Sequence, residues 1–199
     1  MKNALLVIGM QVDLLPGGPA EVPGSDELIA CINEQVAKHD LLIAANFHQP
    51  ANHCTFAANH PWRRPGQTID IGGRPTLLTH LFGVQGSFGA EWMPGLSTQG
   101  IAFTALMGAE ADIPPYSAFY DADKQRDTSL NDFLAANQVD ALCLAGIPLD
   151  EVVRNTALDS LALGYRTSLL VPCCRARLPE QAREVLRELE LAGALLVNY

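Results

Sequence analysis

The stretch that decides the fold is Ala4-Leu5-Leu6-Val7-Ile8-Gly9-Met10-Gln11-Val12-Asp13-Leu14, which is followed by the turn residues Pro16-Gly17-Gly18. An apolar run that ends in a turn signal predicts a fully buried strand, as in the parallel sheet of an α/β protein. Side chains that act on or bind ligands usually gather at the carboxyl end of such a strand. Here that end is occupied by Gly9, which has no side chain.

Outward from this strand, the chain alternates between apolar runs and segments with helical spacing. Helices are expected at 25–38, at 128–136, at 151–163 and from Pro179 to Gly193, and further strands at 40–45, 101–106, 141–145, 167–171 and 194–197. A repeated strand-then-helix order builds parallel sheets that are covered on both faces. The sequence therefore predicts one domain over residues 1–199, with a three-layer α/β/α, Rossmann-like fold and a mainly parallel sheet of about six strands.

A long segment at about 46–100 interrupts this alternation. It is rich in Gly, Pro and aromatic residues, and it holds four of the five histidines: His48, His53, His60 and His80. A loop of this length in a compact domain is usually a functional or binding segment rather than a simple connection. We therefore expect it to be irregular and to contribute to a site.

The charge of the chain limits the classes of partner. A net charge of −9 and a pI of about 4.9 argue against nucleic acid, because neutralising a phosphate backbone needs clustered Lys and Arg. No apolar run of about 18 residues is present for a membrane span, and the N-terminus lacks the basic-then-apolar layout of a signal peptide. We expect a cytoplasmic protein that binds neither nucleic acid nor membranes.

The cysteines carry little information by their spacing. Their number is odd and no C-x-x-C pair is present, so neither a zinc knuckle nor a disulfide framework is indicated. The five residues are Cys31, Cys54, Cys143, Cys173 and Cys174. We expect reduced thiols that serve mainly in packing.

Short motifs are spread from residue 4 to the C-terminus. They include Gln11-Val12-Asp13, Val22-Pro23-Gly24, Pro50-Ala51-Asn52-His53, Val84-Gln85-Gly86, Tyr116-Ser117-Ala118-Phe119 and Thr156-Ala157-Leu158-Asp159. Together they resemble the isochorismatase-like cysteine hydrolase superfamily, and within it the nicotinamidase/pyrazinamidase branch. The resemblance implies a Rossmann-like sheet and, in active members, hydrolysis of a C–N amide bond through a cysteine acyl-enzyme.

The resemblance also locates the catalytic positions. Active members need an Asp that accepts the thiol proton, a Lys beside it, and a Cys nucleophile at the start of a helix. The first-strand motif matches the Asp to Gly9. Counting back nine residues from Tyr116 matches the Lys to Met107, and the motif around 146–156 matches the nucleophile to Val152. None of these three residues can perform the matched role.

A divalent ion (Zn, Fe or Mn) is implied in active members, held by Asp and His side chains. A gapless match puts three other residues at ligand positions, namely Phe47, Gln49 and Phe82. His53 alone is kept. A shift of one residue would offer Asn46 and His48 as weak candidates, but Asn lacks the charge that a hard or borderline cation favours. We expect the metal to be lost and no other cofactor to replace it.

A remnant of the family's pocket is expected to hold a small aromatic or amide ligand. The candidates for lining it are Asp13, Leu14, His53, Tyr116, Ile147 and Pro148. The family is also known for a cis peptide just before the nucleophile turn, at the position of Ile147–Pro148. Because a proline lowers the free energy of the cis form from about 3 to under about 1 kcal/mol, we expect this bond to be cis.

Two functions follow from these observations. The first is a nicotinamidase-like protein that has lost cysteine-dependent hydrolysis and keeps ligand binding or a partner-subunit role. The alternative is a hydrolase of C–N amide bonds in a small aromatic amide such as nicotinamide, using non-family residues such as Asp13, His53 or Cys54. In the family the residue matched by Asp13 is usually structural, and adjacent loop residues such as His53 and Cys54 rarely present both groups to one substrate atom. By analogy with the family we also expect a homo-oligomer.

Overall fold

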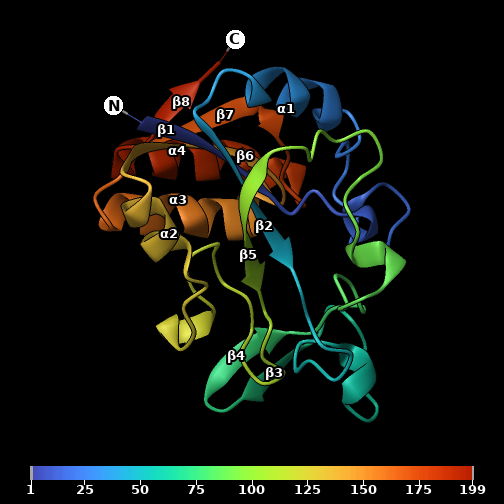
Figure 1. Ribbon diagram of the computed structural model, residues 1–199. Helices are drawn as coiled ribbons and strands as arrows, with labels where there is room; N and C mark the ends of the chain where they lie inside the picture. Colours follow the sequence, from blue (N-terminus) through green and yellow to red (C-terminus); the bar gives the residue numbers. More distant parts are fainter. Residues whose placement is uncertain (1, 199) are drawn as a thin grey trace.

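The computed structural model describes residues 2–198 and is built around a six-stranded sheet (Figure 1). The strands of this sheet are β1 (Lys2–Ile8), β2 (Leu41–Phe47), β5 (Ile101–Met107), β6 (Val139–Gly146), β7 (Arg166–Cys174) and β8 (Leu195–Val197). They lie in the order β5-β2-β1-β6-β7-β8, and every neighbouring pair is parallel. The predicted α/β sheet is confirmed.

The opening stretch forms β1 in the interior of the sheet. Each residue from Ala4 to Ile8 is at most 4% exposed, and β1 pairs with β2 on one side and β6 on the other. A strand covered on both faces has no solvent face for polar side chains, which explains the continuous apolar run.

The helices cover both faces of the sheet. They are α1 (Leu28–Val36), α2 (Leu130–Ala136), α3 (Arg154–Ala162) and α4 (Ala182–Ala192). Figure 1 shows α1 on one side of the sheet and α2, α3 and α4 on the other. Gly193 ends α4 in the left-handed region at φ 105°, as its lack of a Cβ allows. None of the helices within residues 2–198 has the length and apolar character that crossing a lipid bilayer requires.

The turn between β6 and α3 differs from the predicted helix at 151–163. A π-helical turn, Leu149–Val153, comes first, and α3 begins at Arg154. The Ile147–Pro148 bond is cis, as predicted. The chain after β6 therefore turns sharply before the helix starts, and it carries Val152 within that turn.

The segment at 46–100 is not irregular throughout. It contains an antiparallel hairpin of β3 (Thr68–Ile71) and β4 (Arg74–Leu77), so the expectation of an irregular loop is wrong there. Gly72 and Gly73 connect the two strands with φ values of 61° and 84°. A Gly-Gly pair between two short strands is a recognised hairpin signal, so Gly72-Gly73 could have predicted this turn from the sequence.

The expectation of reduced thiols is wrong for two cysteines. Cys31 of α1 and Cys173 of β7 form a disulfide, with their Cα atoms 5.6 Å apart. The two residues are 142 positions apart in sequence, so no local spacing motif could reveal the pairing. The free cysteines are Cys54, Cys143 and Cys174, and complete burial raises the pKa of Cys174 to about 12.

Candidate ligand-binding cavity

A cavity of 720 Å³ lies at the carboxyl edge of the sheet, where open α/β sheets usually bind ligands. Its wall includes Phe47 at the end of β2, Val152 in the turn after β6, and residues 74–77 of the hairpin strand β4. The hairpin therefore closes a side of the cavity that the sheet alone would leave open.

The predicted lining residues are only partly on this wall. Tyr116 lines the cavity and is 38% exposed. The other five, Asp13, Leu14, His53, Ile147 and Pro148, are not among its lining residues. Asp13 has a structural contact instead, because its Oδ2 accepts a hydrogen bond from the backbone N–H of Gly83 at 2.8 Å.

The three positions matched to the catalytic triad lie at one edge of the sheet. Gly9 follows β1, Met107 ends β5, and Val152 follows β6. Met107 is fully buried and Val152 is 4% exposed. Phe47 links the group, since it pairs with Met107 in the register of β2 and β5 and its Cε2 lies 3.6 Å from a Cβ built on Gly9.

The backbone around Gly9 leaves no room for a side chain. Gly9 has φ 68°, and a Cβ built on it lies 2.2 Å from the carbonyl oxygen of Ile147. The N–H of Ile147 donates to the Ile8 carbonyl at 2.9 Å, which holds the turn after β6 against the end of β1. Any larger residue at position 9 would require this backbone to move.

Gln11 of the first-strand motif fixes Phe47. Its side chain is fully buried, its Oε1 accepts from the Phe47 N–H at 2.8 Å, and its Nε2 donates to the Phe47 carbonyl at 2.9 Å. Nε2 also donates to the Ala90 carbonyl at 2.8 Å. Sequence reasoning missed this role, because nothing in local spacing connects residue 11 with residue 47.

The residues at the matched metal positions pack against each other. The rings of Phe47 and Phe82 meet edge to face with centroids 4.9 Å apart, and neither ring offers a donor atom to a cation. The Nε2 of Gln49 donates to the Phe82 carbonyl, and its Oε1 lies 3.4 Å from the Thr55 hydroxyl oxygen, which is closer to His53 Nδ1 at 2.8 Å. This donor set does not fit the metal that the family implies.

No alternative metal cluster takes its place within residues 2–198, where no three His, Cys, Asp or Glu side chains group suitably for a metal ion. The Asn46 Oδ1 is buried without a hydrogen-bond partner. Burial and the positive charge of Arg126 lower the pKa of His48. Of the three weak candidates, His53 has Thr55 and the Ile113 carbonyl as its hydrogen-bond partners.

His53 is held as a neutral ring in a buried hydrogen-bond network. Its Nε2 lies 3.2 Å from the Ile113 carbonyl, while Nδ1 accepts from the Thr55 N–H at 3.2 Å. These partners assign the proton to Nε2. Burial lowers the pKa of His53, although the Ile113 carbonyl and Asp112 act in the opposite direction.

Cys54 has the environment of a passive thiol. Burial raises its pKa, whereas a nucleophilic cysteine needs a lowered one. Its backbone N–H donates to the Ala111 carbonyl at 2.6 Å, and Cys54 is not among the residues of the cavity wall. The residues offered by the alternative hydrolase, Asp13, His53 and Cys54, are thus not among those that line the cavity.

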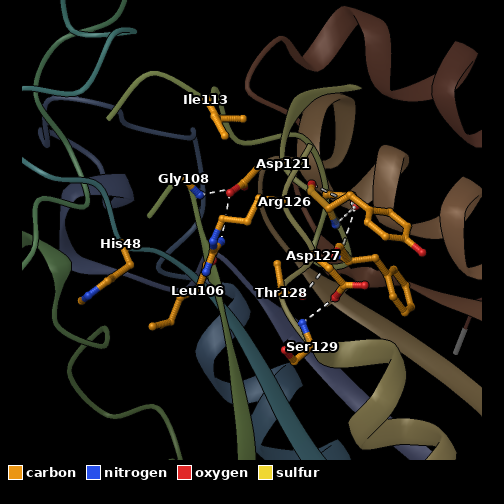
Figure 2. Close-up of polar contacts among 12 residues, drawn as sticks. His48, Leu106, Gly108, Ile113, Asp121, Arg126, Asp127, Thr128 and Ser129 are labelled. Carbon is orange, nitrogen blue, oxygen red and sulfur yellow. Dashed lines mark hydrogen bonds and ion pairs between the residues drawn. The ribbon is translucent and has the colours of Figure 1, made fainter. Parts of the chain in front are cut away.

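An ion pair between a buried Asp121 and a partly exposed Arg126 holds the end of β5 around Met107 (Figure 2). The Oδ1 of Asp121 accepts from the Gly108 N–H at 2.8 Å, and Arg126 Nη1 donates to Asp121 Oδ2 at 2.9 Å and to the Leu106 carbonyl at 2.7 Å. Figure 2 shows Arg126 lying between Asp121 and Leu106. Burial raises the pKa of Asp121 despite these bonds. Neither partner lines the cavity, so the pair supports the strand end.

Comparison with known proteins agrees with this architecture. The isochorismatase domain model matches residues 77–198. The nicotinamidase of Escherichia coli is 33% identical over 203 residues, covering 98% of this chain and 93% of that protein. Among solved structures, a nicotinamidase/pyrazinamidase of Acinetobacter baumanii superposes with a TM-score of 0.93 at 29% identity, over 99% of this chain and 96% of that chain.

A pyrazinamidase of Pyrococcus horikoshii, solved in complex with zinc, superposes with a TM-score of 0.81 at 28% identity and covers 100% of both chains. The matches extend over the sheet, its helices and the cavity edge alike. The chain belongs to the isochorismatase-like superfamily, in its nicotinamidase/pyrazinamidase branch.

Proposed function

We propose that this protein binds a small molecule in the 720 Å³ cavity and does not hydrolyse amides through the cysteine chemistry of its family. The observation that carries the proposal is Val152, which lines the cavity at the position matched to the nucleophile. A valine side chain has no lone pair with which to attack a carbonyl, so no acyl-enzyme forms there.

The other two matched positions support the same proposal. Met107 offers no cation, and Gly9 offers no carboxylate. The Ile147 carbonyl oxygen occupies the space next to Gly9 where a side chain would begin. We also propose that the protein works without a divalent ion, because Phe47 and Phe82 fill two matched ligand positions. Elemental analysis of the purified protein checks this, with less than about 0.1 mol of Zn, Fe or Mn per mol of chain expected.

The names of the relatives suggest which ligands to try first. The E. coli protein is a nicotinamidase, and the A. baumanii structure is of a nicotinamidase/pyrazinamidase. We therefore propose a small aromatic or amide compound as the ligand class. A ligand that binds the folded chain raises its melting temperature in a concentration-dependent way, which a thermal shift measures.

The activity test uses nicotinamide and pyrazinamide with ammonia release as the readout. The E. coli nicotinamidase, measured under the same conditions, serves as the active control. We expect ammonia release at the level of the buffer blank. Turnover that is abolished by a thiol-alkylating reagent would overturn the proposal.

The alternative hydrolase can be separated by two variants. If His53 or Cys54 carried turnover, His53→Ala or Cys54→Ala would abolish it. We expect no turnover in the unmodified protein and therefore no loss in either variant. His53 and Cys54 lie outside the cavity wall, which favours the binding role.

Two further proposals rest on the family resemblance alone. We propose that the protein forms a homo-oligomer and resides in the cytoplasm. Light scattering coupled to size-exclusion chromatography tests the first, and a mass equal to one 21.4 kDa chain at micromolar concentration would refute it.

A further inference from the structure

The inner wall of the cavity is apolar at the positions matched to the family's chemistry. We call this part the apolar floor and define it by Phe47, Phe82 and Val152, all of which line the cavity. Phe47 and Phe82 stand at matched metal positions, and Val152 stands at the matched nucleophile position. The residues that would act on a polar amide in an active member are therefore replaced here by hydrocarbon side chains.

The outer part of the cavity wall is also rich in apolar side chains. Leu77 of β4 lines the cavity and is 55% exposed. The wall also includes five prolines, which are Pro19, Pro65, Pro75, Pro114 and Pro115. An apolar ligand that covers such surface removes it from water, which is favourable in proportion to the area covered.

The uncharged polar side chains beside the floor have partners in the protein. Gln49 is fully buried, and its Nε2 donates to the Phe82 carbonyl at 2.9 Å. The Thr55 hydroxyl oxygen lies 2.8 Å from His53 Nδ1, and the Thr79 hydroxyl donates to the Thr55 carbonyl at 3.3 Å. A carboxamide placed at the floor would lose its hydrogen bonds to water without gaining equivalent ones, which is unfavourable.

The charged side chains of the wall are three arginines and three carboxylates. Arg74 Nε lies 3.1 Å from Asp123 Oδ2, and Arg177 Nε lies 2.7 Å from Glu151 Oε1. The Asp150 carboxylate accepts a hydrogen bond from the backbone N–H of Arg177 at 2.8 Å. These charges are compensated within the wall, so an ionic ligand that gives up its hydration gains little from them.

The third arginine of the wall, Arg154, forms an ion pair with Glu188. Its Nη1 also donates to Asn155 Oδ1 at 3.1 Å, and Asn155 Nδ2 donates to the Tyr116 carbonyl at 3.0 Å. The remaining polar wall residues, Tyr116 and His80, are exposed, so water can satisfy them. Polar recognition is therefore weak at the buried end of the cavity, where the floor lies.

We propose that the cavity selects an uncharged aromatic hydrocarbon and binds aromatic amides and carboxylates poorly. The apolar floor and the apolar outer wall provide the contacts, and the internal pairing of the polar wall residues disfavours a ligand that carries its own amide or charge. This inference rests on the proposed binding function. It narrows the ligand class from small aromatic or amide compounds to apolar aromatic ones.

Three probes that share one benzene ring test the selection by isothermal titration calorimetry of the full chain. They are ethylbenzene, which is apolar throughout, benzamide, with a carboxamide, and benzoate, with a carboxylate. We expect ethylbenzene to bind at one site per chain and at least about tenfold tighter than either polar probe, because it alone loses no strong hydrogen bond to water. A smaller ratio would overturn the inference.

Val152→Thr tests the floor, because threonine keeps the shape of valine and adds a hydroxyl. It should weaken ethylbenzene and strengthen benzamide, so that the ratio of their affinities falls at least about fivefold. Val171→Thr is the matched control, since Val171 of β7 is partly exposed and lies outside the cavity wall. It should leave the ratio unchanged. An unchanged ratio in Val152→Thr would overturn the placement of the ligand on the floor.

Leu77→Asn tests the outer wall at an exposed position, where the fold tolerates a polar side chain. It should weaken ethylbenzene at least about threefold, because apolar contact area is lost. Leu191→Asn is the matched control, since Leu191 of α4 is 79% exposed and lies outside the wall. Equal ethylbenzene affinity in Leu77→Asn and in the unmodified chain would remove the outer wall from the inferred site.

The outcomes also distinguish this inference from the function on which it rests. If benzamide or nicotinamide binds as tightly as ethylbenzene, the apolar ligand class fails while the binding function stands. If no probe, nicotinamide included, binds at millimolar concentration, the proposed binding function and the ligand class both fail.

Discussion

Gly9 has a hydrogen atom where any other residue would carry a Cβ, and the backbone of Ile147 lies too close for a Cβ to fit. The left-handed φ of 68° and the Ile147 carbonyl 2.2 Å from a built Cβ act together. A left-handed conformation alone costs an L-residue about 1–2 kcal/mol. The contact with backbone adds to this, because a backbone carbonyl cannot rotate away as a flexible side chain can.

Gly9→Ala should therefore destabilise the protein by more than about 2 kcal/mol. Gly17→Ala is a matched control, since Gly17 also has a positive φ of 83° but nothing within 4 Å of a built Cβ. Gly17→Ala should lower the free energy of unfolding by only about 1 kcal/mol. Urea unfolding of both variants measures the difference, and equal losses would show that the Ile147 contact is easily relieved.

His53 gives the protein a stability that depends on pH. Its pKa in the folded chain is lowered by burial, so below the unfolded value of about 6.5 the unfolded chain binds more protons. The free energy of unfolding should thus be highest above pH 6.5 and fall as the pH drops toward the lowered pKa, with a slope of at most about 1.4 kcal/mol per pH unit from this residue. His48, whose pKa is also lowered, adds to the same trend.

His53→Asn should make this slope shallower between pH 7.5 and 5.5, whatever it does to stability at neutral pH. Urea unfolding at several pH values measures the slope. If the variant and the unmodified chain show the same slope, His53 is not the titrating group.

Among the elements, α1 and β7 are joined covalently although they lie far apart in the chain. The Cys31–Cys173 disulfide closes a loop across a sequence separation of 142 residues. Restricting so long a loop in the unfolded chain stabilises the fold by about 5 kcal/mol in the chain-entropy estimate. Residues 174–178, which follow Cys173 directly, run to the turn that carries Val152.

Cys31→Ser should lower the free energy of unfolding by about 5 kcal/mol under oxidising conditions. The free, partly exposed Cys54 offers the control, because Cys54→Ser removes a thiol without removing a cross-link. Chemical unfolding with and without a reductant measures both. A stability of the unmodified chain that is insensitive to reductant would contradict the prediction.

At the scale of the whole molecule, the geometry of the three matched catalytic positions is set by four neighbouring strands, β5, β2, β1 and β6. Restoring Gly9→Asp, Met107→Lys and Val152→Cys together should not produce a nicotinamidase. The new Asp would collide with the Ile147 carbonyl, and its side chain would meet Phe47. Ammonia release from nicotinamide measures the outcome, with circular dichroism to establish that the triple variant is folded. Turnover by a folded triple variant would show that the residue types, and not the backbone, account for the inactivity proposed for the unmodified protein.

The sequence by itself determined the parallel sheet, and its family resemblance matched Val152 to the nucleophile position. The sheet follows from local information, because apolar runs and helical spacing report which faces are buried. It also predicted the cis Ile147–Pro148 bond, because the family resemblance implies a cis peptide there and proline lowers the free energy of the cis form.

Only the tertiary structure decided the rest of the site. The Cys31–Cys173 disulfide and the hydrogen bonds between Gln11 and Phe47 each join residues that are far apart in sequence. The cavity wall likewise brings Arg74 of the hairpin together with residues of the sheet edge. The closure around Gly9 depends on β1 lying beside β6, which are separated by more than half of the chain. Periodicity encodes the face that a side chain presents, whereas the partner it meets there is set by how the elements pack in three dimensions.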